Sequence, residues 1–136
     1  MVEQDFLDPI YRNRDIIEEV SVCLIRYSKF YANPFNIMPY SIDMMNPERR
    51  EIRIRDYETA ADKTRELSAK LRASTNNICF YNFFYKIDLI KNTKEDVLES
   101  ASLLMRLSNS YFSIDRGVEN SDTSDLIREK LGIVLD

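Results

Sequence analysis

The 136-residue sequence contains no histidine. Without imidazole there is no Ser–His or Cys–His pair to activate a nucleophile, and no side chain whose ordinary pKa lies near neutrality. Zinc, copper and haem sites that use histidine ligands are excluded for the same reason. We therefore expect no catalytic residues, no bound metal and no cofactor, and we expect that the protein is not an enzyme.

Glycine is nearly as scarce, with only Gly117 and Gly132 in the whole chain. Nucleotide-binding loops of the P-loop and Rossmann types need several glycines, which let backbone N–H groups approach the phosphates. Both kinds of loop are therefore excluded. No other site for a small-molecule substrate is evident in the sequence.

The two cysteines, Cys23 and Cys79, lie in apolar runs and form no metal-binding or redox motif. We expect both to be buried free thiols, as in a reducing compartment. The first residues are acidic, unlike a secretory signal. The densest apolar run, Ile78 to Ile90, is too short and too polar to cross a bilayer. These features predict a cytoplasmic protein with no membrane partner.

What is present is a globular composition, with 44% hydrophobic and 31% charged residues and a net charge of −4. A chain of this length can bury one sizeable core without disulfide or metal cross-links. Apolar residues recur with helical spacing over most of the chain. The sequence predicts a mostly α fold, a small antiparallel bundle of four to five helices, folded as a single helical domain over residues 1–136.

Capping residues and breaks give the approximate ends of these helices. Asp8–Pro9 is typical of a helix start, and Asn33–Pro34 of an end. Thr93 is a candidate cap, and Gly132 a helix stop. The expected helices cover residues 9–33, 56–73, 78–90, 94–112 and 125–131.

The segment from Pro34 to Arg55 is ambiguous. Ser41–Met45 and Glu51–Arg55 each alternate between apolar and polar residues, which is compatible with a short β-hairpin around residues 41–55. Alternatively, Asn46 caps a helix that begins at Pro47, or the segment is an irregular loop. The sequence slightly favours the helix or the loop.

A cluster of arginines is the first candidate binding site. Its members are Arg49, Arg50, Arg53 and Arg55. Arginine binds phosphate and carboxylate groups through two hydrogen bonds, so this patch could bind nucleic acid or an acidic protein. The alternative is that these arginines form weak surface ion pairs with acidic neighbours. The pI of about 5.0 argues against nonspecific duplex binding.

An aromatic segment at residues 80–85 is the second candidate. On a helix it would carry two apolar stripes. One comprises Phe80, Phe83, Phe84, Ile87 and Ile90, and the other Ile78, Tyr81, Tyr85 and Leu89. If the first stripe faces the core, Tyr81, Tyr85 and Leu89 form an outer face suited to binding a protein. The alternative is a central helix that is buried all round.

Acidic residues suggest no further site. Asp15, Glu18 and Glu19, and likewise Glu95, Asp96 and Glu99, lie off the apolar stripes, as expected for a solvated helix surface.

The sequence thus predicts a non-enzymatic macromolecular-interaction protein. It would be an adaptor or regulator, or an accessory protein of a virus, phage or mobile element, and its partner would be another protein or a second copy in a homodimer. Contact would run through Tyr81, Tyr85 and Leu89 or through the arginine patch. The alternative function is a nucleic-acid-associated regulator that uses Arg49, Arg50, Arg53 and Arg55.

Overall fold

The computed structural model describes residues 2–36 and 46–133, with side chains from Leu7 onward. Within these residues the fold is all-α, which confirms the predicted helical bundle. The elements are α1 (Val2–Arg26), α2 (Ser28–Ala32), α4 (Pro47–Asn76), α5 (Tyr81–Lys86), α6 (Lys94–Ser108), the 3-10 turn η1 (Ile114–Arg116) and α7 (Gly117–Leu131). None of the helices described is long and apolar enough to cross a bilayer.

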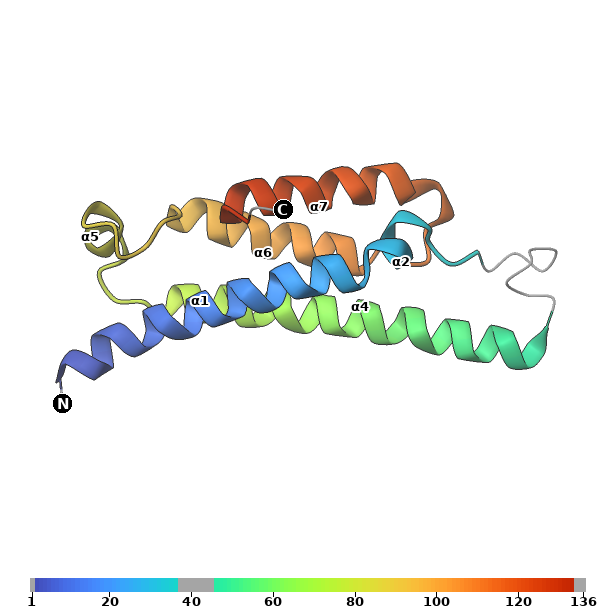
Figure 1. Ribbon diagram of the computed structural model, residues 1–136, viewed down its shortest axis with the longest axis horizontal. Coiled ribbons are helices and arrows are strands. Elements are labelled where there is room, and N and C mark those ends of the chain that lie inside the picture. The colour runs from blue at the N-terminus through green and yellow to red at the C-terminus, as the bar shows by residue number, and fades with distance from the viewer. Residues whose placement is uncertain (1, 37–45, 134–136) are drawn as a thin grey trace.

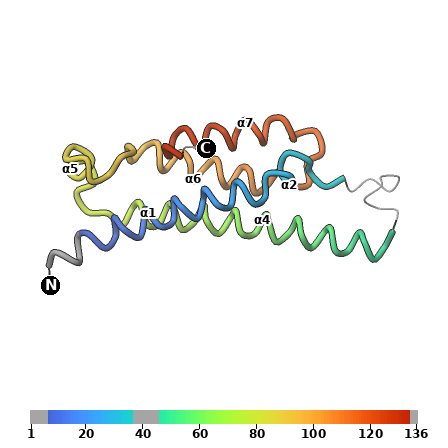
Figure 2. The backbone as a smooth tube through the Cα atoms, viewed as in Figure 1, coloured from blue at the N-terminus to red at the C-terminus, as the bar shows by residue number. Residues whose placement is uncertain are grey.

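The four long helices α1, α4, α6 and α7 run alternately up and down (Figure 1). Helix α4 packs against both α1 and α6, and α6 packs against α7. The smooth trace in Figure 2 shows α5 at one end of the bundle, while the N-terminal part of α4 extends past α2 at the other end. The two ends therefore present different elements to a partner.

Helix α4 begins at the cap that the sequence indicated. The side chain of Asn46 accepts hydrogen bonds from the backbone N–H groups of Glu48 and Arg49, both at 3.1 Å. The helical alternative is therefore confirmed, and a hairpin strand at residues 51–55 is wrong. The other proposed strand, residues 41–45, lies outside the described residues.

Several helix boundaries differ from prediction. The predicted helix over residues 9–33 is divided into α1 and α2, and α6 ends at Ser108. Helix α1 begins at Val2 and contains Pro9, so it continues through a residue that lacks a backbone N–H donor. Helix α4 continues to Asn76, and the Thr75 hydroxyl donates to Leu71 O at 2.6 Å inside the helix. Helix α7 begins at Gly117 rather than near Asp125, because Asn120 and Ser124 of its polar first turns are buried and the helix packs against α2.

The start of α7 shows why a polar stretch forms a helix here. Asn120 is buried, and its amide donates to Tyr31 O at 2.9 Å. The hydroxyls of Ser124 and Tyr31 are 2.8 Å apart. A Cβ on Gly117 would lie 2.3 Å from Ala32 O, so only glycine permits this approach. Tertiary hydrogen bonds thus replace the apolar stripe that the sequence lacks.

The main core lies between α1, α4, α6 and α7. Helix α4 contributes many small residues to it, including Ala60, Ala61 and Ser68. The Ser68 hydroxyl donates to Ala101 O of α6 at 2.5 Å, so the two backbones approach closely. Thr64, one turn earlier on α4, lies 2.9 Å from the hydroxyl of Tyr111, which follows α6. We call this region, with Thr64, Ser68 and Ala101, the α4–α6 interface.

A second, smaller core supports α5. It comprises Ile10, Ile78, Tyr81, Phe84 and Ile90. Cys79, beside it in the chain, is exposed, whereas Cys23 is buried, and both thiols are free. The prediction that both cysteines are buried is therefore wrong for Cys79.

Candidate functional site

Helix α5 is bounded by two residues in the left-handed conformation, Phe80 with φ 59° and Asp88 with φ 64°. At its end, Leu89 N–H donates to Phe84 O and Asp88 N–H donates to Tyr85 O, which closes the helix as a Schellman motif does. The predicted continuous helix over residues 78–90 is therefore wrong. Left-handed residues at both ends cannot belong to a right-handed helix, so only residues 81–86 are helical.

The inner face of α5 holds Tyr81 and Phe84 in the second core. The Tyr81 hydroxyl donates to Asn92 O at 2.6 Å. Burial raises the pKa of Tyr81 to about 12. The expectation that Tyr81 belongs to the outward stripe is thus wrong, because this side chain anchors α5 to the bundle.

Four large apolar side chains are exposed on α5 and at its two caps. They are Phe80 (68% exposed), Phe83 (58%), Ile87 (51%) and Tyr85 (40%). We call these four residues the aromatic knob. Tyr85 is exposed, as predicted, whereas Leu89 is only half-buried and packs against the second core. Phe80, Phe83 and Ile87 were expected in the core and are exposed, whereas Phe84 and Ile90 of the same stripe are buried as expected.

The aromatic knob exposes a large apolar area. Fully exposed aromatic side chains present about 150–250 Å² each, so the fractions above sum to roughly 500 Å² over the four residues. Exposed apolar surface of this kind on a folded protein is often an interaction site. The exposed cations Lys86 and Lys91 lie close in sequence, so the apolar patch has a polar border.

The arginines lie in the first turns of α4, but they do not form one stripe. At 100° per residue, Arg49, Arg50 and Arg53 fall within an arc of about 100°, and Arg55 lies on the other side of the helix. The Arg53 guanidinium lies over the Tyr57 ring, 5.8 Å from its centre. Between described residues, no ion pair involves Arg49, Arg50 or Arg55. Pairing with acidic neighbours is thus not observed for these three.

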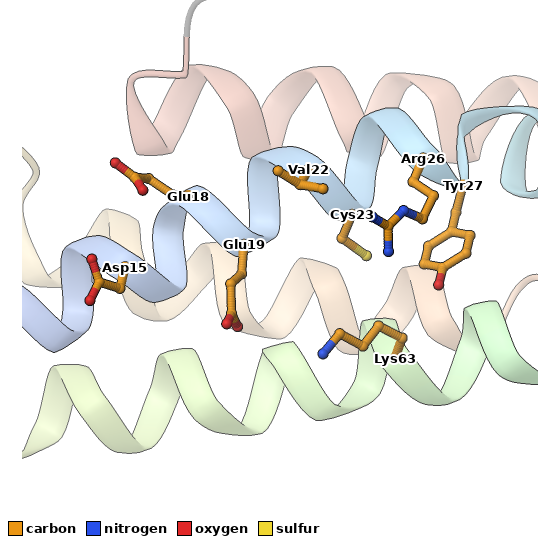
Figure 3. Close-up of a pocket in the computed structure, with 8 residues that line it drawn as sticks. All are labelled: Asp15, Glu18, Glu19, Val22, Cys23, Arg26, Tyr27 and Lys63. Carbon is orange, nitrogen blue, oxygen red and sulfur yellow. The ribbon is translucent and has the colours of Figure 1, made fainter.

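A groove of about 570 Å³ runs between α1 and α4 (Figure 3). It is lined by Asp15, Glu18, Glu19, Val22, Cys23, Arg26, Tyr27 and Lys63. Carboxylates occupy one end, Arg26 and Lys63 occupy the other, and Glu19 and Lys63 extend into the space between the helices. The sequence analysis missed this groove, since its two walls are distant in the chain.

The thiol at the base of this groove is poorly suited to nucleophilic chemistry. Cys23 is buried, and its sulfur lies 3.6 Å from the Thr64 hydroxyl. Burial raises the pKa of Cys23, so the thiol stays protonated at neutral pH. The groove is therefore better suited to binding charged groups than to catalysis.

Hydroxyl and metal-ligating residues form no further site in the part of the chain that the structure describes. Ser108 donates to Met105 O at 2.6 Å and Ser110 donates to Arg106 O at 3.0 Å, so both hydroxyls are used in the fold. No group of three or more potential metal-ligating cysteine or acidic residues is found there.

Comparison with known proteins finds no family model that matches the chain, and no curated protein or solved structure that is similar to it. A function must therefore be argued from the geometry of its own surfaces.

Proposed function

We propose that this chain is a non-enzymatic interaction protein that binds a protein partner through the aromatic knob. The observation that carries the proposal is the outward placement of Phe80, Phe83, Tyr85 and Ile87 on a supported element. Exposing large apolar side chains is unfavourable in water, and aromatic residues dominate the energetic centres of protein interfaces. A partner that covers these residues would remove their apolar surface from water, and this burial would favour the complex.

The support beneath the knob favours binding. Tyr81 and Phe84 fix α5 from below, and the Arg14 guanidinium donates to Leu89 O at its C-terminal end. An element held in its binding conformation loses little conformational entropy when a partner docks. The knob therefore resembles a preorganised binding element more than a flexible loop.

The area of the knob also limits the kind of partner. Its roughly 500 Å² falls short of the roughly 800 Å² per partner in a stable interface between folded proteins. A partner with a concave apolar pocket buries more surface than a flat partner does, because the walls of the pocket also contact the polar border of the knob. We therefore propose a pocket on the partner that receives Phe80 and Phe83.

Site-specific crosslinking tests this proposal. A photoreactive phenylalanine analogue at position 83 should capture one discrete protein in the native cell. The same analogue at Val118, which is 78% exposed on α7, is the control. With the captured protein purified, Phe80→Ser/Phe83→Ser should weaken binding by about 100-fold or more. Equal capture at both positions, or unchanged affinity, would contradict the proposal.

A nucleic-acid-associated regulator remains the second candidate. The observation in its favour is that the guanidinium groups of Arg49, Arg50 and Arg55 have no ion pair among described residues. Three carboxylates are interleaved with the four arginines over residues 47–56, so the segment has a net charge of only 4 − 3 = +1. Oligonucleotide binding at low salt that is lost in Arg49→Glu/Arg50→Glu would support this function, and no binding at low salt would remove it.

A further inference from the structure

The N-terminal part of α4, residues 47–56, extends past the end of α2 (Figure 1). We call this segment the α4 overhang. On its outer side Arg49 and Asp56 are exposed, and Ile52 is 59% exposed. Neither Arg49 nor Asp56 forms an ion pair with another described residue. The overhang therefore presents two uncompensated charges and an apolar side chain.

These three side chains lie on one stripe of the helix. At 100° per residue, Arg49, Ile52 and Asp56 fall within an arc of about 60°. Along the helix axis the order is a cation, an apolar group and then a carboxylate, over about 10 Å.

The wall of the groove on α1 has the opposite order. Asp15, Glu19, Val22 and Arg26 share an arc of about 60° on that helix. From its N-terminal end the order is carboxylates, then Val22, which is 51% exposed, and then Arg26 beside Lys63 of α4. The distance along the α1 axis from the midpoint of the two carboxylates to Arg26 is about 13 Å. This distance is close to the separation of Arg49 and Asp56 on the overhang.

Arg49 cannot reach Glu19 of its own chain. Glu19 and Lys70 line the same pocket between α1 and α4. Arg49 precedes Lys70 by 21 residues on a continuous helix, which corresponds to about 31 Å. An arginine side chain cannot span that distance, so the overhang can fill such a groove only on another molecule.

We propose that two copies of this chain form a two-fold symmetric dimer, in which the α4 overhang of each copy lies along the α1–α4 groove of the other. Arg49 then lies opposite Asp15 and Glu19, Ile52 against Val22, and Asp56 opposite Arg26 and Lys63.

The helix directions are consistent with this symmetry. The charge order requires the overhang to run parallel to α1 of the other copy. Because α1 and α4 are antiparallel within a chain, the two α4 helices of the dimer run antiparallel. A two-fold axis across α4 therefore fills both grooves with the same contact, and the assembly closes at two copies. This surface is distinct from the aromatic knob, so each can be tested without the other.

Sedimentation velocity of the full chain over a range of concentrations and at low and high salt measures the association. We expect a dimer whose dissociation constant rises with salt. Arg49→Glu and Glu19→Arg should each raise that constant by about tenfold, since each reverses two symmetric charge contacts. The double variant Arg49→Glu/Glu19→Arg restores opposite charges at both contacts and should recover much of the affinity.

Arg55→Glu is the matched control. Arg55 is exposed on the same segment and has no ion pair among described residues, but it lies about 90° around the helix from the middle of the stripe. This variant should change the dissociation constant much less than Arg49→Glu does, and circular dichroism should show native helix content in every variant. Monomers at all concentrations, open-ended oligomers, or equal effects of Arg49→Glu and Arg55→Glu would each overturn the proposal. So would a dimer that dissociates in Phe83→Ser but not in Arg49→Glu, since it would depend on the aromatic knob.

Discussion

The α4–α6 interface and the aromatic knob are close in sequence but use their residues in opposite ways. Inside the bundle, Thr64 and Ser68 are polar and have at most 2% of their surface exposed. At the start of α5, the cap residue Phe80 and Phe83 are apolar and more than half exposed. The comparison shows that the geometry of helix approach, rather than residue hydropathy alone, decides which side chains are buried.

The polar groups at the interface are buried without remaining unpaired. Thr64 donates to Ala60 O at 2.8 Å, and Ser68 donates to Ala101 O. A buried hydroxyl that keeps a hydrogen bond avoids most of the cost of leaving water. Its small volume also lets α4 and α6 approach more closely than leucine would.

At the aromatic knob, the backbone conformation rather than hydropathy decides which side chains are exposed. The left-handed residues Phe80 and Asp88 fix how α5 turns relative to the bundle. That orientation places Tyr81 and Phe84 inward and leaves Phe83 outward. An apolar residue thus remains exposed because its neighbours already fill the second core.

The largest effect should come from emptying the main core. Leu104 on α6 is fully buried, and Leu104→Ala should lower the free energy of unfolding by about 3 kcal/mol, because it leaves a cavity. Urea denaturation measures this loss. Leu104→Met, which nearly conserves volume, is the control and should cost under about 1.5 kcal/mol. A similar loss in both variants would contradict tight packing at this position.

Removing one hydroxyl from the α4–α6 interface should have a smaller effect. Thr64→Val leaves the buried Tyr111 hydroxyl without its 2.9 Å partner, and the expected loss is about 2 kcal/mol. Thr59→Val, at an exposed position on the same helix, should change stability little. If the two variants behave alike in urea denaturation, the hydroxyl network does not stabilise the fold.

The next largest loss of stability is expected at Tyr81, which anchors the aromatic knob. Tyr81→Phe removes the hydrogen bond to Asn92 O and should cost about 1 kcal/mol. The pKa of Tyr81 is raised from 10.0 to about 12 in the folded chain, so the folded state keeps a proton that the unfolded state releases. The stability linked to this proton is fully present below pH 10 and is lost as the pH rises toward 12.

The pH dependence of stability tests the burial of the Tyr81 hydroxyl. Urea denaturation from pH 9 to about 12 should show a shallower loss of stability in Tyr81→Phe than in the unmodified chain. Identical slopes in the two proteins would show that Tyr81 ionises equally in the folded and unfolded states.

The smallest effect on stability is expected at the knob itself. Phe83→Ser should change the free energy of unfolding by about 0.5 kcal/mol, because more than half of the side chain is already exposed. Its neighbour Phe84 is buried, and Phe84→Ser should destabilise the chain by several times that amount. Thermal denaturation of the two variants provides the comparison, and equal melting temperatures would contradict the assigned faces.

Much of the helical scaffold could be predicted from local signals. Thr93 accepts a hydrogen bond from Asp96 N–H at 3.1 Å, as its capping pattern indicated, and Gly132 ends α7 in the left-handed conformation. The arginine cluster was also found, although its division between two sides of α4 required the helix itself. By contrast, the polar start of α7 gave no helical signal, since its order comes from Tyr31 and other distant partners.

By itself the sequence determined a mostly α chain, because capping residues and apolar spacing act over a few neighbouring positions. Only the tertiary structure decided that Tyr81 is an anchor while Phe80 and Phe83 face water, and that Glu19 and Lys63 share a groove. The physical reason is that burial and charge pairing depend on which helices meet, and each helix here meets partners dozens of residues away in the chain.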